Sequence, residues 1–144
     1  MAHLLLLNGP NLNLLGTRDP KVYGSTTLAE IDAELVRRGK ARGAQVRSAQ
    51  SNIEGELVDL IQRAKGWADA IVINPGAYTH YSYSLRDAIS ATRLRVVEVH
   101  LSDLTQREPW RRVSLIAEVA AHRIMGKGIA GYLEALEWLA THPR

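Results

Sequence analysis

Short apolar runs alternate with stretches of helical periodicity along the whole chain, and this alternation limits the fold more than any other feature. The apolar runs occupy residues 4–8, 70–73 and 96–99, and residues 45–49 and 120–125 are further strand candidates. Runs of this length are typical of strands buried on both faces of a parallel sheet. Parallel neighbours need a crossover connection, which is usually a helix. The alternation therefore predicts an α/β fold with a five-stranded parallel sheet covered by helices on both faces.

Helical spacing and capping signals mark the crossovers between these strands. The apolar positions at helical spacing are Leu28, Ile31 and Leu35; Leu57, Leu60, Ile61 and Ala64; Leu85, Ala88 and Ile89; and Ile129, Tyr132, Leu133, Leu136 and Leu139. Thr27 and Glu30 form a capping box ahead of the first helix, and Ser82 or Ser84 caps the third. We expect a flavodoxin-like, doubly wound α/β/α arrangement of three layers in a single domain of residues 1–144.

Composition excludes several classes of protein. The chain has no Cys, which rules out disulfides and thiolate metal sites and suits a reducing cytosol. The apolar run of residues 4–7 is too short for a signal peptide or a membrane span, so we expect a cytoplasmic protein with no membrane partner. The net charge of +3 is modest, its cations are scattered, and Phe is absent. A nucleic-acid partner is therefore not expected.

Polar side chains cluster after three of the predicted strands. They are Asn8, Asn11, Asn13, Arg18 and Tyr23 after the first; Asn74, Tyr78, Thr79 and His80 after the third; and Glu98, His100, Ser102, Asp103, Arg107 and Arg111 at the end of the fourth and beyond it. Ligands of open α/β sheets bind outside the carboxyl ends of the strands. Each group alone also fits a turn, a cap or an ordinary surface residue. Their convergence at one end of the sheet indicates an enzyme.

The residue types exclude most familiar chemistries. No Gly-x-Gly-x-x-Gly, Walker-type Gly-Lys-Ser/Thr or Gly-x-Ser-x-Gly sequence is present, so nucleotide phosphates and a serine nucleophile lack their usual sites. Two well-placed His without Cys disfavour a tight transition-metal site, and we expect no metal and no cofactor. Proton chemistry on an anionic organic molecule remains. His100 with Glu98 can act as acid or base, while Arg, Ser and Asn can hold carboxylate and hydroxyl groups.

Several motifs, in colinear order along nearly the whole chain, resemble those of type II 3-dehydroquinate dehydratases. They are Asn8-Gly9-Pro10-Asn11-Leu12-Asn13-Leu14-Leu15-Gly16 with Arg18 and Tyr23-Gly24; Gln50-Ser51-Asn52 with Glu54-Gly55-Glu56-Leu57; Ile73-Asn74-Pro75-Gly76-Ala77-Tyr78-Thr79-His80; Ser84-Leu85-Arg86-Asp87-Ala88; Glu98-Val99-His100-Leu101-Ser102; and residues 126–132. This resemblance implies conversion of 3-dehydroquinate to 3-dehydroshikimate by anti elimination of water through an enolate. A biosynthetic and a catabolic role both stay open.

The resemblance also implies catalytic roles. Tyr23 takes the C2 proton, and Arg18 on the same loop favours the tyrosinate, since a nearby cation lowers a tyrosine pKa. Asn11 holds a water that stabilises the enolate oxygen. His100 protonates the departing hydroxyl, and Glu98 orients its ring or raises its pKa.

Substrate binding and assembly follow from the same resemblance. Asn74, Ser102 and the Leu101 amide would hold the substrate carboxylate, and His80 and Arg111 would hold ring hydroxyls. Asp87 would reach in from a neighbouring subunit. The family implies trimers that assemble into a homododecamer, a tetramer of trimers.

This chain departs from the family pattern at several positions. They are Ile53, Asp103, Thr105, Pro109-Trp110 and Arg112-Val113. Asp103 matters most, because a carboxylate beside the site repels an anionic substrate unless it is neutralised, for which Arg107 is the candidate. Two other classes therefore stay open: a flavodoxin-like binding module without catalysis, and an interaction protein that uses the trimer surface.

Overall fold

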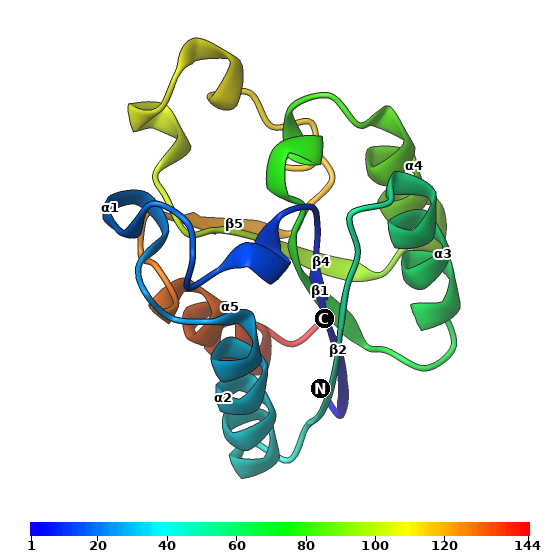
Figure 1. Ribbon diagram of the computed structural model, residues 1–144. Coiled ribbons are helices and arrows are strands. Elements are labelled where there is room, and N and C mark those ends of the chain that lie inside the picture. Colours follow the sequence, from blue (N-terminus) through cyan, green and yellow to red (C-terminus); the bar gives the residue numbers. More distant parts are fainter.

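The computed structural model describes residues 1–144 apart from the side chain of Tyr23, and its strands form one parallel sheet (Figure 1). The strands are β1 (His3–Asn8), β2 (Gln45–Gln50), β3 (Ala70–Asn74), β4 (Arg95–His100) and β5 (His122–Met125). Their order is β2-β1-β3-β4-β5 and every pairing is parallel. The flavodoxin-like order expected from the sequence is confirmed. The order reverses between β1 and β3, which is where such sheets bind ligands.

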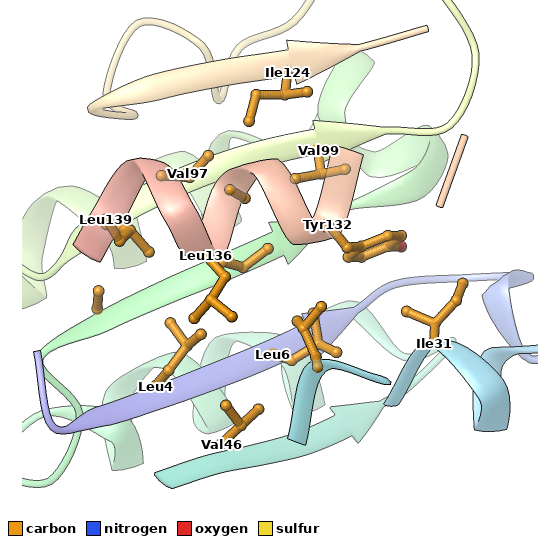
Figure 2. Packing of buried hydrophobic residues seen from close by; sticks show 14 of the residues in the cluster. Leu4, Leu6, Ile31, Val46, Val97, Val99, Ile124, Tyr132, Leu136 and Leu139 are labelled. Atoms are coloured by element: carbon orange, nitrogen blue, oxygen red, sulfur yellow. The ribbon is translucent and has the colours of Figure 1, made fainter. Parts of the chain in front are cut away.

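Helices cover both faces of the sheet (Figure 1). They are α2 (Leu28–Ala41) and α5 (Ala130–Thr141) on one face, and α3 (Glu54–Ala64) and α4 (Tyr83–Thr92) on the other. Alternate residues along β1 separate two cores: Leu4 and Leu6 pack with α2 and α5, whereas Leu5 and Leu7 pack with α3 and α4. Figure 2 shows the first of these cores. None of the described helices is long and apolar enough to cross a lipid bilayer.

Local signals place the helix starts as expected. Thr27 Oγ1 accepts from the Glu30 amide at 3.2 Å, and Glu30 Oε1 accepts from the Thr27 amide at 3.5 Å, so the capping box is present. Ser82, rather than Ser84, caps α4, because its Oγ accepts from the Leu85 amide at 3.0 Å. These bonds satisfy amides that no helical carbonyl reaches.

Three segments differ from the sequence expectation. The last strand starts at His122 rather than at residue 120, because the Ala120 amide bonds to the Ile116 carbonyl at 2.9 Å in a turn. The loop after β1 contains η1 (Leu12–Leu14) and α1 (Pro20–Tyr23). The loop after β4 contains η3 (Leu104–Gln106) and η4 (Pro109–Arg111), and η2 (Gly76–His80) follows β3. The loops that surround the predicted site are therefore built from short helical turns.

Candidate active site

The loops after β1 and β3 lock together at two glycines. The Gly9 amide donates to the Asn74 carbonyl at 2.8 Å. A Cβ on Gly9 would lie 2.5 Å from the Pro75 carbonyl oxygen, and one on Gly76, whose φ is +59°, would lie 2.9 Å from the Pro10 carbonyl oxygen. No other residue type fits this approach of two backbones. The interlock fixes one wall of a pocket above the switch point.

Asn11 stands at the entrance of η1 in the left-handed conformation, with φ of 70°. Its amide donates to Asn52 Oδ1 at 3.0 Å, and the same oxygen accepts from Gln50 Nε2 at 3.2 Å. Gln50 Nε2 also lies 3.1 Å from the Gly9 carbonyl oxygen. The end of β2 thus supports the Asn11 turn. Gln50 and Asn52 belong to one of the motifs that resemble the family, but that motif does not by itself predict this supporting role.

Glu98 and His100 form a buried dyad on one face of β4. Residues two apart on a strand share a face, and His100 Nε2 lies 2.5 Å from Glu98 Oε2. Glu98 has no exposed surface, whereas His100 reaches the pocket with about 5% of its surface exposed. An ionised carboxylate only accepts hydrogen bonds, so Nε2 of the histidine carries the proton. The predicted pairing of the two residues is therefore present.

Two hydroxyls that sequence reasoning did not assign complete the surroundings of Glu98. Thr79 Oγ1 lies 2.5 Å and Ser114 Oγ 2.7 Å from Glu98 Oε2, and the two hydroxyl oxygens are 2.8 Å apart. Burial raises the pKa of Glu98, but the hydrogen bonds from His100, Thr79 and Ser114 outweigh it and hold that pKa below its usual value. The carboxylate is therefore ionised at neutral pH.

His80 is held in one tautomer by the backbone. Its Nδ1 lies 2.6 Å from the Val113 carbonyl oxygen, which can only accept, so Nδ1 is protonated. Burial lowers the pKa of His80, and the nearby charges of His100 and Arg111 add to this effect. At neutral pH the imidazole is uncharged, and its Nε2 can accept a hydrogen bond. The Trp110 ring meets the His80 ring edge to face at 5.3 Å.

These residues surround a pocket that opens to solvent. Its described lining consists of Pro10, Asn11, Leu12, Arg18, Asn74, Gly76, Ala77, His80, His100, Leu101, Ser102, Leu104, Arg107 and Arg111. Three guanidinium groups and no carboxylate belong to this set. Charge-assisted bonds from Arg favour carboxylates and other anions, so the pocket suits a small anionic ligand.

The structure brings most of the predicted site residues together. Asn11, Arg18, Asn74, His80, His100, Leu101, Ser102 and Arg111 all line the pocket, and Glu98 lies behind His100. Asp87 does not line it; it lies on the exposed side of α4 in a separate depression with Tyr83, Ser84, Arg86, Ser90 and Val119. The predicted base, Tyr23, lies outside the described side chains. No three His, Asp or Glu side chains among the described residues gather as metal ligands.

Arg107, one of the polar residues expected after the fourth strand and the predicted neutraliser of Asp103, lines the pocket. Its Nη1 donates to Ser102 Oγ at 2.9 Å. The Asp103 carboxylate instead accepts from the Thr105 amide at 2.9 Å and hydroxyl at 2.6 Å, as the cap of η3. The hydrogen bonds from Thr105 lower the pKa of Asp103. Two of the departures from the family pattern, Asp103 and Thr105, are therefore hydrogen-bonded to each other.

The remaining departures lie at the rim of the site or away from it. Ile53 is about 63% exposed and does not line the pocket. Pro109 begins η4, whose last residue, Arg111, lines the pocket and pairs with Glu108 at 2.8 Å. Although Pro109 and Trp110 depart from the family pattern, η4 thus still places Arg111 in the site.

Comparison with known proteins agrees with this geometry. The family model of class II dehydroquinases matches residues 2–140. The chain belongs to this family. It is 56% identical over 142 residues to a 3-dehydroquinate dehydratase of Ruegeria pomeroyi, covering 99% of this chain and 95% of the relative. It is 55% identical over 138 residues to one of Pelotomaculum thermopropionicum, covering 96% of each.

A solved structure of a type II dehydroquinase shares the fold. The protein comes from Butyrivibrio crossotus and superposes with a TM-score of 0.95 at 39% identity, covering 97% of this chain and 98% of that one. This coverage extends over the pocket loops as well as the sheet. The chain thus shares both the sheet and the loops at the site with that type II dehydroquinase.

Proposed function

We propose that this chain dehydrates 3-dehydroquinate to 3-dehydroshikimate by anti elimination through an enolate, with Tyr23 as base and His100 as general acid. The observation that carries the proposal is the buried Glu98–His100 dyad, at 2.5 Å, opening into a pocket lined by Arg and Asn. A dyad of this kind supplies a proton to a departing group. The arginines favour a carboxylate substrate. Family membership supports the identity of that substrate.

His100 acts at the departing hydroxyl through its Nδ1. Its Nε2 proton is held by Glu98 at 2.5 Å, so Nδ1 is the nitrogen that exchanges a proton with the substrate. In the doubly protonated ring, the Glu98 carboxylate stabilises the positive charge. When the enolate re-forms the carbonyl, its electrons make the new carbon–carbon double bond and break the bond to the departing oxygen. Proton transfer from Nδ1 to that oxygen releases water and leaves the imidazole neutral. Thr79 and Ser114 keep the carboxylate in place during this step.

Tyr23 and Arg18 form the opposite half of the reaction. Tyr23 accepts the C2 proton, and the electron pair moves onto the carbonyl oxygen as an enolate. Arg18 lines the pocket, and Asp19 Oδ1 starts α1 by accepting from the Lys21 amide at 3.0 Å. α1 then carries the chain to Tyr23. A water held by Asn11 and the backbone of the interlocked loops stabilises the enolate oxygen.

Binding of the substrate divides between two groups of residues. Asn74, Ser102 and the Leu101 amide hold its carboxylate, and His80 and Arg111 hold ring hydroxyls. All of them line the same pocket, which supports this division. Neutral His80 accepts from a hydroxyl through Nε2, while Arg111 donates. A donor and an acceptor side by side suit an alcohol better than either alone.

Asp87 completes the site from a neighbouring subunit of a homododecamer built as a tetramer of trimers. Within one chain it lies in the depression with Tyr83, away from the lined pocket. Tyr81 and Tyr83, at the start of α4, are 61% and 68% exposed. Exposed aromatics beside a carboxylate suit a protein interface. We also propose that residues 1–144 form one domain.

A direct assay tests the proposed activity. Purified protein is mixed with 3-dehydroquinate, and the ultraviolet absorbance of the conjugated enone product is followed. We expect turnover that survives exhaustive chelation and dialysis. His100→Ala should lower kcat by about two orders of magnitude or more, the usual scale of general-acid removal. No absorbance change with the unaltered protein would refute the enzyme in favour of a binding module.

A further inference from the structure

A hydrogen-bond chain links three elements behind the pocket. Asn74 Nδ2 donates to the Tyr132 hydroxyl at 3.0 Å, and that hydroxyl donates to Asn8 Oδ1 at 2.6 Å. Asn8 and Asn74 are register partners at the ends of β1 and β3, and Tyr132 lies in the first turn of α5. Figure 2 shows the Tyr132 ring at the carboxyl end of the strands, with Leu136 and Leu139 farther along the same helix, toward the amino ends of the strands. These hydrogen bonds thus connect α5 to the pocket across the switch point.

The backbone fixes which groups donate and which accept in these hydrogen bonds. The Gly76 amide donates to Asn74 Oδ1 at 3.1 Å, so the other end of the amide, Nδ2, must face Tyr132. The tyrosine hydroxyl has a single hydrogen, which then goes to Asn8 Oδ1. Turning the Asn74 amide over would place its Nδ2 against the Gly76 amide, which is also a donor. Turning the Asn8 amide over would leave the tyrosine hydrogen without an acceptor. Asn74 is therefore held with one Nδ2 hydrogen on Tyr132 and the second left for a ligand.

Stability alone does not explain these polar groups. Asn8 and Tyr132 have no exposed surface, and Asn74 is only 4% exposed. Asn8 Nδ2 is buried without a partner among the described residues, and an unpaired buried donor destabilises a fold. Burial also raises the pKa of Tyr132 strongly, so its hydroxyl stays neutral and keeps its hydrogen. Apolar residues at both positions 8 and 132 would avoid these penalties, which argues that the hydrogen-bonded network serves the site.

We infer that Tyr132 is a positioning residue for substrate binding: its hydroxyl holds the Asn74 amide in the orientation that receives the substrate carboxylate. This inference rests on the proposed function, in which Asn74 contacts that carboxylate. Tyr132 touches no ligand itself and acts only through Asn74. A preorganised amide avoids the cost of being ordered when the substrate binds.

Steady-state kinetics of Tyr132→Phe test the inference. Phenylalanine keeps the buried ring and removes the hydroxyl alone. KM for 3-dehydroquinate should rise about five- to tenfold, the scale of one hydrogen bond, with kcat changed less than twofold. A contact made equally in the ground and transition states affects KM rather than kcat. Asn74→Ala should raise KM further. The double variant should be no worse than Asn74→Ala, because both changes remove one interaction.

Two further variants separate positioning from stability. Thr92→Val removes a buried hydroxyl that donates to the Ile89 carbonyl at 3.1 Å on α4, away from the pocket. It should lower the Tm without changing KM. Asn8→Ala removes the hydrogen-bond acceptor of the Tyr132 hydroxyl and keeps the tyrosine itself in the core. KM should again rise, with kcat retained.

Several outcomes would overturn the inference. They are an unchanged KM in Tyr132→Phe or Asn8→Ala, an equal rise in Thr92→Val, and additive effects in the double variant. Inactive wild-type protein would overturn the proposed function and the inference together, whereas active wild-type protein with a normal Tyr132→Phe KM would overturn the inference alone.

Discussion

At the residue scale, the most informative group is the carboxylate of Glu98. Its Oε2 accepts hydrogen bonds from His100, Thr79 and Ser114, whereas its Oε1 is buried without a partner among the described residues. A fully buried carboxylate with one unpaired oxygen is expensive. The three donors at Oε2 nevertheless hold the pKa of Glu98 below its usual value. We interpret this arrangement as a site built to hold a charged acceptor behind His100, the proposed general acid.

The lowered pKa of Glu98 predicts how stability depends on pH. Because the folded pKa lies below the usual value of 4.5, the stabilising effect is complete above about pH 4.5 and is lost as the pH falls through the folded pKa. Glu98→Gln removes this titration. Urea unfolding of both proteins from pH 7 to pH 3 should show a steeper acid loss in the wild type. Parallel curves would contradict this assignment.

Tyr23 and Arg18 should behave as one catalytic unit. Tyr23→Phe removes the proposed base while keeping the ring, and kcat should fall at least about two orders of magnitude. Arg18→Ala should move the pH–rate profile to the alkaline side, because loss of the cation raises the tyrosine pKa. The double variant should be little worse than Tyr23→Phe alone.

The measurement is kcat as a function of pH for the three variants. A Tyr23→Phe protein with normal kcat would remove the base from the mechanism. His80 or His100 would then have to accept the C2 proton.

At the scale of elements, the site depends on how closely the β1 and β3 loops approach. Gly9 and Gly76 allow this contact, and the Gly9 amide bonds across it to Asn74. The strand ends therefore act as a rigid base for the more open α1 and η4 segments. Rigid scaffolds with variable loops are the usual arrangement of α/β sites.

Gly9→Ala should disrupt this contact. The new Cβ would lie 2.5 Å from the Pro75 carbonyl oxygen, so the loops must separate. We expect a loss of about 1–3 kcal/mol in the free energy of unfolding together with reduced activity. Gly55→Ala, on α3 where a Cβ meets no atom within 4 Å, is the matched control. It should be neutral or stabilise by up to about 1 kcal/mol. Equal effects of the two substitutions in chemical denaturation would contradict the interlock.

At the scale of the whole molecule, the position of Asp87 predicts assembly. Light scattering should show a large oligomer, consistent with a dodecamer, and Asp87→Ala should lower activity while the oligomer persists. Tyr83→Glu places a charge on a residue that is 68% exposed and should favour smaller, inactive species. A monomer with full activity would refute the shared site.

The sequence by itself determined the alternation of strands and helices, the start of α2 and most of the pocket. Apolar runs identify β1, β3 and β4 because burial on both faces removes polar residues, and the capping at Thr27 is local. Since parallel strands end at one edge, polar residues after three strands had to converge. The family motifs added proposed roles for Asn11, Asn74 and His100.

Only the tertiary structure decided the contacts between segments far apart in the chain. Thr79 and Ser114 reach Glu98 from separate loops, and Tyr132 reaches Asn74 across 58 residues. A lone Thr, Ser or core Tyr has no periodic or capping signal that names its partner. Asp103 shows the same limit: its sequence position suggested a charge facing the substrate, but the η3 turn directs its carboxylate to Thr105. Such pairings depend on three-dimensional packing, which local sequence patterns do not encode.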